Sequence, residues 1–333
     1  MKVFQNTRLC KARFLAATWL IPIVICPDAF LLQAQDGPSF KSRSKAYAAQ
    51  RKDEQALADY NREISSYNRA ISRNPKNANN FYNRGALHQV HGNLALALAD
   101  YSQAIRLNPR DADNFLNRGT VHQEQGKLFL ATADYSHAIR LKPRYALAFY
   151  NRGIAYQNQD MLELAISDYN QAIKYNPRDG DSFFNRGAAH HDQGKMGLAI
   201  ADYSQAIRLN PRDVDPLVCR GRIYFTQGKF ELAMVDYDRA IRLNPREADP
   251  LVGRGEIYFA QGKSELAMVE YDRAIRINPK HARAFYRRGK AYKAQGRLSD
   301  ARRDLKACLS YAPRDRSSKV LISRAQALLA SME

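Results

Sequence analysis

The sequence predicts an all-α protein built from antiparallel helix pairs that stack side by side. Three observations predict this fold class: prolines recur at a fixed spacing, other residue types recur in register with them, and apolar residues inside each unit follow helical spacing. The recurring prolines, each 34 residues after the last, are Pro75, Pro109, Pro143, Pro177, Pro211, Pro245, Pro279 and Pro313. A fixed period of this length indicates a repeat array, which grows in one direction and has no single core.

One unit shows why each repeat is expected to form two helices. Leu217 and Tyr224 are seven residues apart, which places them on one face of a helix. Gly228 suits the left-handed conformation that ends a helix. Ala233 and Tyr237 then mark the packed face of a second helix, which the recurring proline cannot continue. Each pair leaves an apolar face open, and stacking the next pair covers it.

The recurring columns resemble the tetratricopeptide repeat over seven full units, residues 78–313. The columns are Gly85, Gly119, Gly153, Gly187, Gly221, Gly255 and Gly289; Ala97, Ala131, Ala165, Ala199, Ala233, Ala267 and Ala301; and Tyr101, Tyr135, Tyr169, Tyr203, Tyr237 and Tyr271, with Leu305 last. Both the period and the residue types agree with this family's pattern. The resemblance implies a right-handed superhelical solenoid with a concave groove that binds another protein.

The segments on either side of the repeats complete the domain organisation. Residues 35–77 are expected to be a polar linker followed by a degenerate first repeat or one long helix. Residues 314–333 carry an apolar stripe typical of a C-terminal capping helix.

Residues 1–34 are expected to be a signal peptide. A basic start is followed by an apolar stretch over 14–26 and a small residue, Ala34. The stretch is shorter than a membrane-spanning helix needs, so a cleaved signal is favoured over a membrane anchor. This predicts an exported, periplasmic or envelope-associated bacterial protein.

The charge balance predicts anionic partners. The chain has a formal net charge of +19, and residues 280–324 contain fourteen Lys or Arg against three Asp. The last repeat presents Arg283, Arg287, Lys290 and Lys293 as a candidate basic patch. Either this patch receives the acidic end of a ligand, or it is a solvated basic face.

An arginine column and an acidic column have two interpretations. The arginines are Arg84, Arg118, Arg152, Arg186, Arg220, Arg254 and Arg288, and sixteen residues after each stands Asp100, Asp134, Asp168, Asp202, Asp236, Glu270 or Asp304. The arginines could form a ladder that binds phosphate or acidic groups, or each could form an ion pair within its repeat. The ion pair is favoured, because an acid accompanies every arginine.

The candidate ligand groove has an asparagine column and several aromatic residues. They are Asn83, Asn117, Asn151, Asn185, Tyr82, Tyr150, Phe184, Phe225 and Phe259. The family resemblance implies that asparagines on the concave face can hold a peptide backbone, because a carboxamide both donates and accepts. The alternative is that these asparagines bond neighbouring helices.

Gln89, Gln123, Gln157 and His191 accompany them in the same groove. A chaperone-tail clamp is rejected, because Val218, Arg222 and Gly253 stand where the family places other clamp residues.

The histidines and cysteines do not indicate chemistry. His88, His122 and His190 stand where other repeats carry tyrosine, and equivalent residues of stacked repeats lie too far apart to share a metal. Cys219 and Cys308 are not expected to form a disulfide. No cofactor, metal or catalytic constellation is expected.

The sequence therefore predicts a non-catalytic protein–protein interaction scaffold. It would bind an extended peptide or a helix of another protein, with an acidic partner segment favoured and self-association left open. The alternative function is binding of nucleic acid or an anionic surface through the basic C-terminal end.

Overall fold

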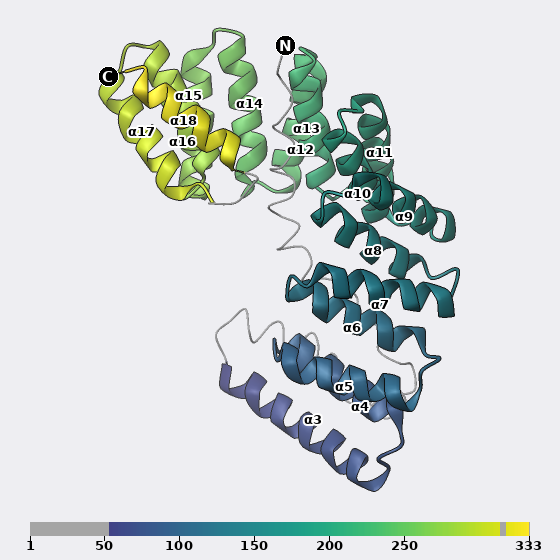
Figure 1. The fold of residues 1–333 in the computed structure, drawn as a ribbon. Helices are drawn as coiled ribbons and strands as arrows, with labels where there is room; N and C mark the ends of the chain where they lie inside the picture. The colour runs from purple at the N-terminus through teal and green to yellow at the C-terminus, as the bar shows by residue number, and fades with distance from the viewer. Residues whose placement is uncertain (1–52, 314–317, 333) are drawn as a thin grey trace. The chain divides into compact units, whose positions relative to one another are not determined.

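The structure, a computed structural model, describes residues 53–313 and 318–332, and these residues form helices joined by short connections (Figure 1). The predicted signal peptide and linker lie outside the described residues. Seven helix pairs occur within 78–311, which confirms the predicted fold class. The first helices of the pairs are α4 (Ala78–Val90), α6 (Ala112–Glu124), α8 (Ala146–Asn158), α10 (Gly180–Asp192), α12 (Asp215–Thr226), α14 (Ala248–Ala260) and α16 (Ala282–Ala294). The second helices are α5 (Leu94–Leu107), α7 (Leu128–Leu141), α9 (Leu162–Tyr175), α11 (Met196–Leu209), α13 (Phe230–Leu243), α15 (Ser264–Ile277) and α17 (Leu298–Tyr311).

Two further helices flank the pairs. Helix α3 (Asp53–Arg73) is a single long helix that packs against α4, and α18 (Lys319–Ala330) packs against α16 and α17. The chain divides after Pro177 into two compact parts, here called the N-terminal block (α3–α9) and the C-terminal block (α10–α18).

Small residues and tyrosines explain how the two helices of a pair approach each other. Ala165 and Tyr169 on α9 are fully buried against α8. A Cβ atom at Gly153 on α8 would lie 2.7 Å from the Tyr169 ring, so a larger residue would push the helices apart. The turn between the two helices of a pair needs a left-handed residue, which is Gly228 (φ +73°) in the fifth repeat and Asp160 (φ +66°) in the third.

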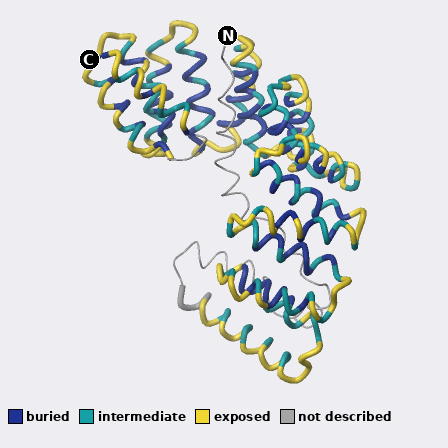
Figure 2. Tube along the Cα trace, in the orientation of Figure 1, coloured by how far each residue is buried: buried dark blue, intermediate teal, exposed yellow. Residues whose placement is uncertain are grey.

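The first helices form the inner layer of each block. In both blocks, successive first helices contact one another, as α6 does with α8 and α14 with α16. The second helices expose large apolar side chains to solvent, among them Leu164, Leu232 and Leu266. Figure 2 shows buried residues along the helix sides that meet a neighbour and exposed residues at the connections. The surface of the first helices that faces away from their second helices is called here the first-helix face.

Helix α18 covers the apolar end of the last pair. Leu321 and Leu328 pack against a cluster that contains Leu305 and Cys308, both fully buried. Burial raises the pKa of the Cys308 thiol to about 12, and this cysteine is free. Over the part of the chain that the structure describes, every helix is too short or too polar to span a bilayer.

Candidate functional site

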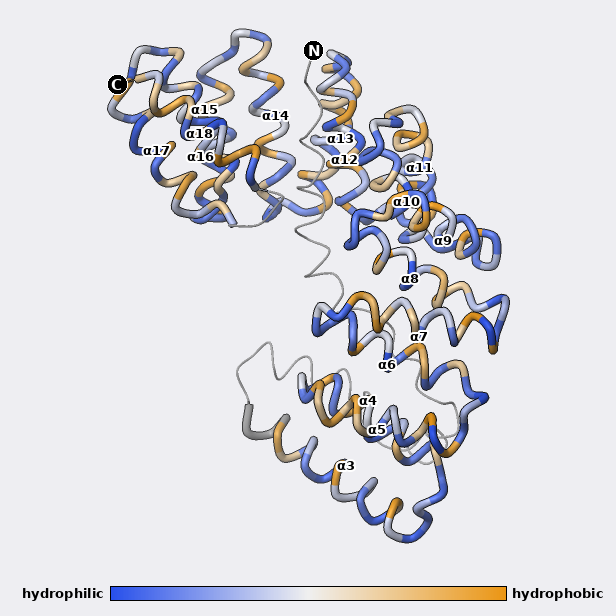
Figure 3. Tube along the Cα trace, viewed as in Figure 1, coloured by the Kyte–Doolittle hydropathy of each residue, from blue (hydrophilic) through white to orange (hydrophobic). Residues whose placement is uncertain are grey.

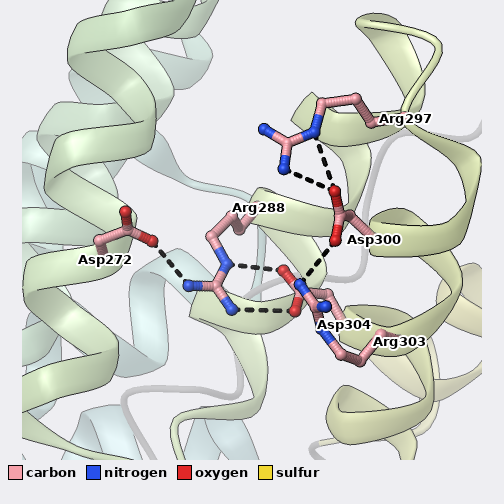
Figure 4. Close-up of polar contacts among 6 residues, drawn as sticks. All are labelled: Asp272, Arg288, Arg297, Asp300, Arg303 and Asp304. Atoms are coloured by element: carbon pink, nitrogen blue, oxygen red, sulfur yellow. Dashed lines mark hydrogen bonds and ion pairs between the residues drawn. The ribbon is translucent and has the colours of Figure 1, made fainter.

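The arginine column forms an ion pair in every repeat, which confirms the favoured interpretation. In six of the seven repeats between residues 78 and 313, Nε and Nη2 of the arginine donate to the two carboxylate oxygens at 2.6–2.9 Å. Figure 4 shows this fork between Arg288 on α16 and Asp304 on α17. The sixth repeat differs, because Glu270 accepts one bond from Arg254 at 2.7 Å. These arginines join the helices of each pair and are not open to a ligand.

The same arginines also reach the second helix of the preceding repeat. Nη1 of Arg152 donates to Ser136 at 2.9 Å, and Nη1 of Arg288 donates to Asp272 at 2.6 Å (Figure 4). The accepting residues stand sixteen positions before six of the seven arginines, and they are Asn68, Ser102, Ser136, Ser204, Asp238 and Asp272. This column was not predicted from the sequence, although its spacing was visible. Each of these six arginines therefore ties three helices together.

The asparagine column is buried between successive first helices. Asn117 is 3% exposed and its Nδ2 donates to the Tyr82 hydroxyl of the preceding repeat at 2.8 Å. Asn151 is fully buried, and its amide has no partner among the described residues because Leu116 stands where a tyrosine would accept. Asn185 is also buried and Asn83 is half-buried. To hold a peptide backbone, as predicted, these side chains would have to be exposed. In the structure three of the four are buried and Asn83 is half-buried.

The sixth repeat cannot continue the asparagine column for a steric reason. Gly253 stands at that position, and a Cβ atom there would lie 2.4 Å from the Tyr237 ring. The ring fills the space that an asparagine side chain would need.

The predicted groove aromatics pack mainly against second helices. Tyr82 is 4% exposed and the other four are half-buried. The ring centroid of Tyr150 lies 6.2 Å from that of Tyr169, and the centroid of Phe184 lies 5.7 Å from that of Tyr203. Phe225 contacts Phe230 in the same way at 5.6 Å, and Nζ of Lys290 lies 5.7 Å from the centroid of Phe259. These rings fill space within the array, and the four half-buried ones keep part of their surface exposed.

The glutamine column accepts hydrogen bonds from the buried tyrosines. The hydroxyls of Tyr101, Tyr135 and Tyr169 donate to Oε1 of Gln89, Gln123 and Gln157 at 3.0, 3.1 and 2.8 Å. In the fourth repeat His191 replaces glutamine, and the Tyr203 hydroxyl has no partner among the described residues. Burial, and to a smaller extent the nearby charge of Arg222, lower the pKa of His191 to about 4.

Two of the four cations of the predicted basic patch pair with one buried carboxylate. Glu256 on α14 accepts from Nη2 of Arg283 at 2.7 and 2.9 Å and forms an ion pair with Arg287. Lys293 donates to Ser331 at 2.5 Å, which leaves Lys290 as the exposed member. Burial raises the pKa of Glu256, but the charges of Arg283 and Arg287 outweigh burial and hold it below its ordinary value. The sequence alone leads us to expect four unpaired cations here. It does not show that Glu256 of the preceding repeat pairs with Arg283 and Arg287.

Arg222 on α12 lies near Arg283 and Glu256, but it forms no ion pair with any carboxylate among the described residues. It is 8% exposed, and its Nε and Nη1 have no hydrogen-bond partner among the described residues. Burial lowers its pKa, and the charge of Arg283 lowers it further. The nearest carboxylates are engaged elsewhere: Glu256 with two arginines, and Asp249 with Nε2 of His281 at 3.3 Å. Three guanidinium groups therefore share two carboxylates across α12, α14 and α16.

Family models match most of the repeats. Models described as TPR repeat match residues 91–126, 124–160, 221–262 and 255–296. Models described as tetratricopeptide repeat match residues 146–179, 180–213 and 282–315. Together these matches cover well over half of the sequence. The chain belongs to the tetratricopeptide-repeat family.

Solved structures agree with this fold. A tetratricopeptide repeat protein from Parabacteroides merdae is 22% identical, with a TM-score of 0.62 over 77% of this chain and 98% of that one. Yeast Tom70 is 14% identical, with a TM-score of 0.57 over 98% of this chain and 72% of that one. Cut9 in the APC/C hetero-tetramer Cut9–Hcn1 is 16% identical, with a TM-score of 0.58 over 80% and 52% of the two chains. No curated protein matches the sequence.

Tetratricopeptide-repeat arrays are typically non-catalytic scaffolds for protein–protein interaction, and the matching family models are all of this kind. The histidines of this array lie against the acidic column: Nε2 of His88 is 3.7 Å from Asp100, and Nε2 of His190 is 3.9 Å from Asp202. Among residues 53–313 and 318–332, the structure contains no group of three side chains able to hold a metal ion. The coarse function is therefore a protein-interaction scaffold.

Proposed function

We propose that this scaffold binds an extended segment or a helix of another protein on the first-helix face of the C-terminal block. An acidic side chain of that segment would lie against the cluster of Arg222, Arg283 and Arg287 and offset its surplus positive charge. The observation that carries the proposal is the buried guanidinium of Arg222, whose Nε and Nη1 have no partner among the described residues.

A buried charge without a counter-charge is unfavourable by itself. Removing a charged group from water costs several kcal/mol unless hydrogen bonds and an opposite charge offset the loss. Arg222 lies within a cluster of three arginines and two carboxylates, so the cluster has a surplus positive charge. A carboxylate is the group that a guanidinium binds best, through two parallel N–H···O bonds.

The cluster also explains why a protein segment would lie along several repeats. Its residues come from α12, α14 and α16, which are successive first helices of one block. Phe225 and Phe259 are half-exposed on α12 and α14 and provide apolar area beside the charges. Arginine and aromatic residues together are typical of the few side chains that supply most binding energy.

The proposal can be tested with random twelve-residue peptides displayed on phage and selected on the full-length chain. We expect the selected peptides to share an Asp or Glu position. In fluorescence polarisation, Arg222→Gln should weaken binding of the best peptide at least tenfold, because a charge-assisted bond contributes about 1.5–3 kcal/mol. Replacing the shared acid by its amide should weaken binding by a similar factor.

Arg242→Gln is the matched control, because Arg242 is an exposed arginine on the second helix α13. It should leave peptide affinity unchanged. Arg222→Gln should also keep or raise thermal stability, since it removes an unpaired buried charge, and this would separate lost binding from unfolding. Selected peptides without a shared acid, or equal affinity of the Arg222→Gln variant, would contradict the proposal.

The alternative function, polyanion binding through the basic C-terminal end, receives little support from the contacts there. Arg283 and Arg287 pair with Glu256, Arg288 pairs with Asp272 and Asp304, and Arg297 and Arg303 pair with Asp300 (Figure 4). These pairs engage five of the arginines that the sequence places there, so these five are less free to bind a polyanion.

We further propose that the chain is exported to the bacterial cell envelope, which rests on the basic start and apolar stretch within residues 1–34. Fusing residues 1–43 to an alkaline phosphatase that is active only outside the cytoplasm tests this proposal. We expect phosphatase activity in the periplasm, and Ile23→Asp should abolish it by interrupting the apolar stretch. A fusion that stays inactive in cells would contradict export.

A further inference from the structure

The connections between repeats carry a recurring pair of cations. In the C-terminal block the chain leaves three of the four second helices, α11, α13 and α15, through the sequence Arg-Leu/Ile-Asn-Pro-Arg/Lys. All the cations of this sequence in three consecutive connections are exposed, and we call them the basic edge: Arg208, Arg212, Arg242, Arg246, Arg276 and Lys280. The N-terminal block has the same pattern of exposed cations at Arg106, Arg110, Arg140 and Arg144.

Antiparallel pairing places these connections together. The second helix of each repeat returns to the end at which its first helix began, so the connections α11–α12, α13–α14 and α15–α16 all lie at one end of their helix pairs. The turns inside the repeats lie at the other end. Figure 3 shows hydrophilic residues at the connections. Six cations of one block therefore share one edge of that block.

The charges of the basic edge are not neutralised within the described residues. None of the six takes part in an ion pair there, and Arg208 bonds only to the neutral Gln205, at 2.9 Å through Nε. Two of the nearby carboxylates have other partners: Asp213 accepts the backbone N–H of Asp215 at 3.0 Å, and Asp249 lies 3.3 Å from His281.

Helix stability explains only half of these cations. Arg208, Arg242 and Arg276 stand in the last turn of a helix, where a positive charge interacts favourably with the helix dipole. Arg212, Arg246 and Lys280 lie beyond the proline, outside any helix, so this explanation does not apply to them. A second cation in each connection doubles the charge of the edge without stabilising a helix.

We propose that the basic edge docks on a bilayer surface that contains anionic phospholipids. Equivalent residues of stacked repeats are on the order of 10 Å apart, about one Debye length, so their fields add to one continuous band. The anionic headgroups of a bilayer are spread over a surface. They can therefore contact both cations of each connection at the same time. Each cation close to such a surface strengthens binding by roughly fivefold.

The chemistry of the connections favours a headgroup layer over nucleic acid. The segments 208–212, 242–246 and 276–280 contain no aromatic residue on which a base could stack. Their asparagines are used in the turns, where Oδ1 of Asn244 and of Asn278 accept the backbone N–H of Arg246 and Lys280 at 3.2 and 3.0 Å. The edge therefore offers charge alone, without groups that read a sequence.

Sedimentation with vesicles tests the proposal on the full-length chain. The measured quantity is the ratio of its partition onto phosphatidylcholine vesicles containing 30% phosphatidylglycerol to its partition onto pure phosphatidylcholine vesicles. We expect a ratio of about a thousand or more at 50 mM salt, because six cations each contribute roughly fivefold, and a steep fall by 300 mM. The triple variant Arg212→Glu, Arg246→Glu, Lys280→Glu should lower the ratio by about a hundredfold, from three lost cations.

The matched control changes the same net charge in the same three repeats at the other end of the helix pairs. It is Lys195→Glu, Lys229→Glu, Lys263→Glu, whose lysines are exposed in the turns inside the repeats. It should lower the ratio less than tenfold. Equal losses in the two variants, a ratio near one for the unmodified chain, or tighter binding to a 20-base-pair DNA duplex than to the anionic vesicles would each overturn the proposal.

Discussion

Glu270 breaks the geometry that the other six acids of its column share. Its extra methylene leaves its Oε2 and the Nε of Arg254 without partners among the described residues, whereas each aspartate of the column accepts two bonds. We expect Glu270→Asp to restore the fork and raise the free energy of unfolding by about 1 kcal/mol, measured by urea denaturation. Glu265→Asp, at an exposed position of the same helix, is the control. If both variants are equally stable, the fork does not explain the column.

His191 makes the fold sensitive to acid. Its pKa is about 4 in the folded chain because of burial and the charge of Arg222, and an unfolded histidine titrates near 6.5. The unfolded state therefore binds the proton more tightly, so stability is full above pH 6.5 and falls as the pH drops toward 4. The loss should reach about 3 kcal/mol.

His191→Gln tests this origin of acid sensitivity, because it inserts the residue that the preceding repeats carry at the same position. We expect a flatter pH dependence of the thermal midpoint between pH 6.5 and 4, and higher stability at pH 7 if the new amide accepts from Tyr203. Some slope should remain, since burial also lowers the pKa of His88, His122 and His190. An unchanged slope would show that His191 is not the main source.

At the scale of elements, α18 protects the apolar end of the array. Ending the chain after Pro313 would uncover the cluster around Leu305 and Cys308. We expect iodoacetamide to alkylate Cys308 at least tenfold faster in this variant, because solvent reaches the thiol and the pKa of about 12 falls. Peptide mass mapping measures the rate. Lys319→Ala, at an exposed position of α18, should leave it unchanged. Equal rates in all three proteins would mean that α18 does not cover this end.

The elements themselves were predictable because each one depends on neighbours close in sequence. The proline, glycine and alanine columns set the helix ends and the approach within a pair, and Gly153 against Tyr169 is such a contact, sixteen residues apart. The binding residues were harder to predict, because their environment comes from other repeats. Asn117 donates a hydrogen bond to Tyr82, and Arg283 donates to Glu256. A column of identical residues in the sequence does not show which of them have such partners in neighbouring repeats.

The exposed cations escaped prediction for a different reason. The sequence concentrates charge near the C-terminus, yet Arg288 and Arg297 there have acidic partners, whereas Arg212 and Arg246 in the connections have none among the described residues. Counting charges along a sequence does not distinguish paired from unpaired cations. Their spacing of 34 residues was the available signal.

For the whole molecule, stability should vary along the chain. Each repeat contacts only its neighbours, so opening is expected to begin where a helix has the fewest packed faces. Among the described helices, α3 packs mainly against α4 and exposes Leu57, whereas α7 packs against both α6 and α8. We expect amides of α3 to exchange at least a hundredfold faster than those of α7 in hydrogen-exchange mass spectrometry. Uniform protection across both helices would indicate all-or-none unfolding.

The arginine that ties three helices together also bears on how such a chain can change in length. Arg152 donates to Asp168 of its own repeat and to Ser136 of the preceding repeat. Ser102 stands at the position equivalent to Ser136 one repeat earlier. Excision of residues 112–145 would bring Ser102 to the place that Ser136 now holds, with the same hydroxyl offered to the same guanidinium. Loss of this one whole period from the gene would therefore keep the bonds of Arg152 to both of its neighbouring helices.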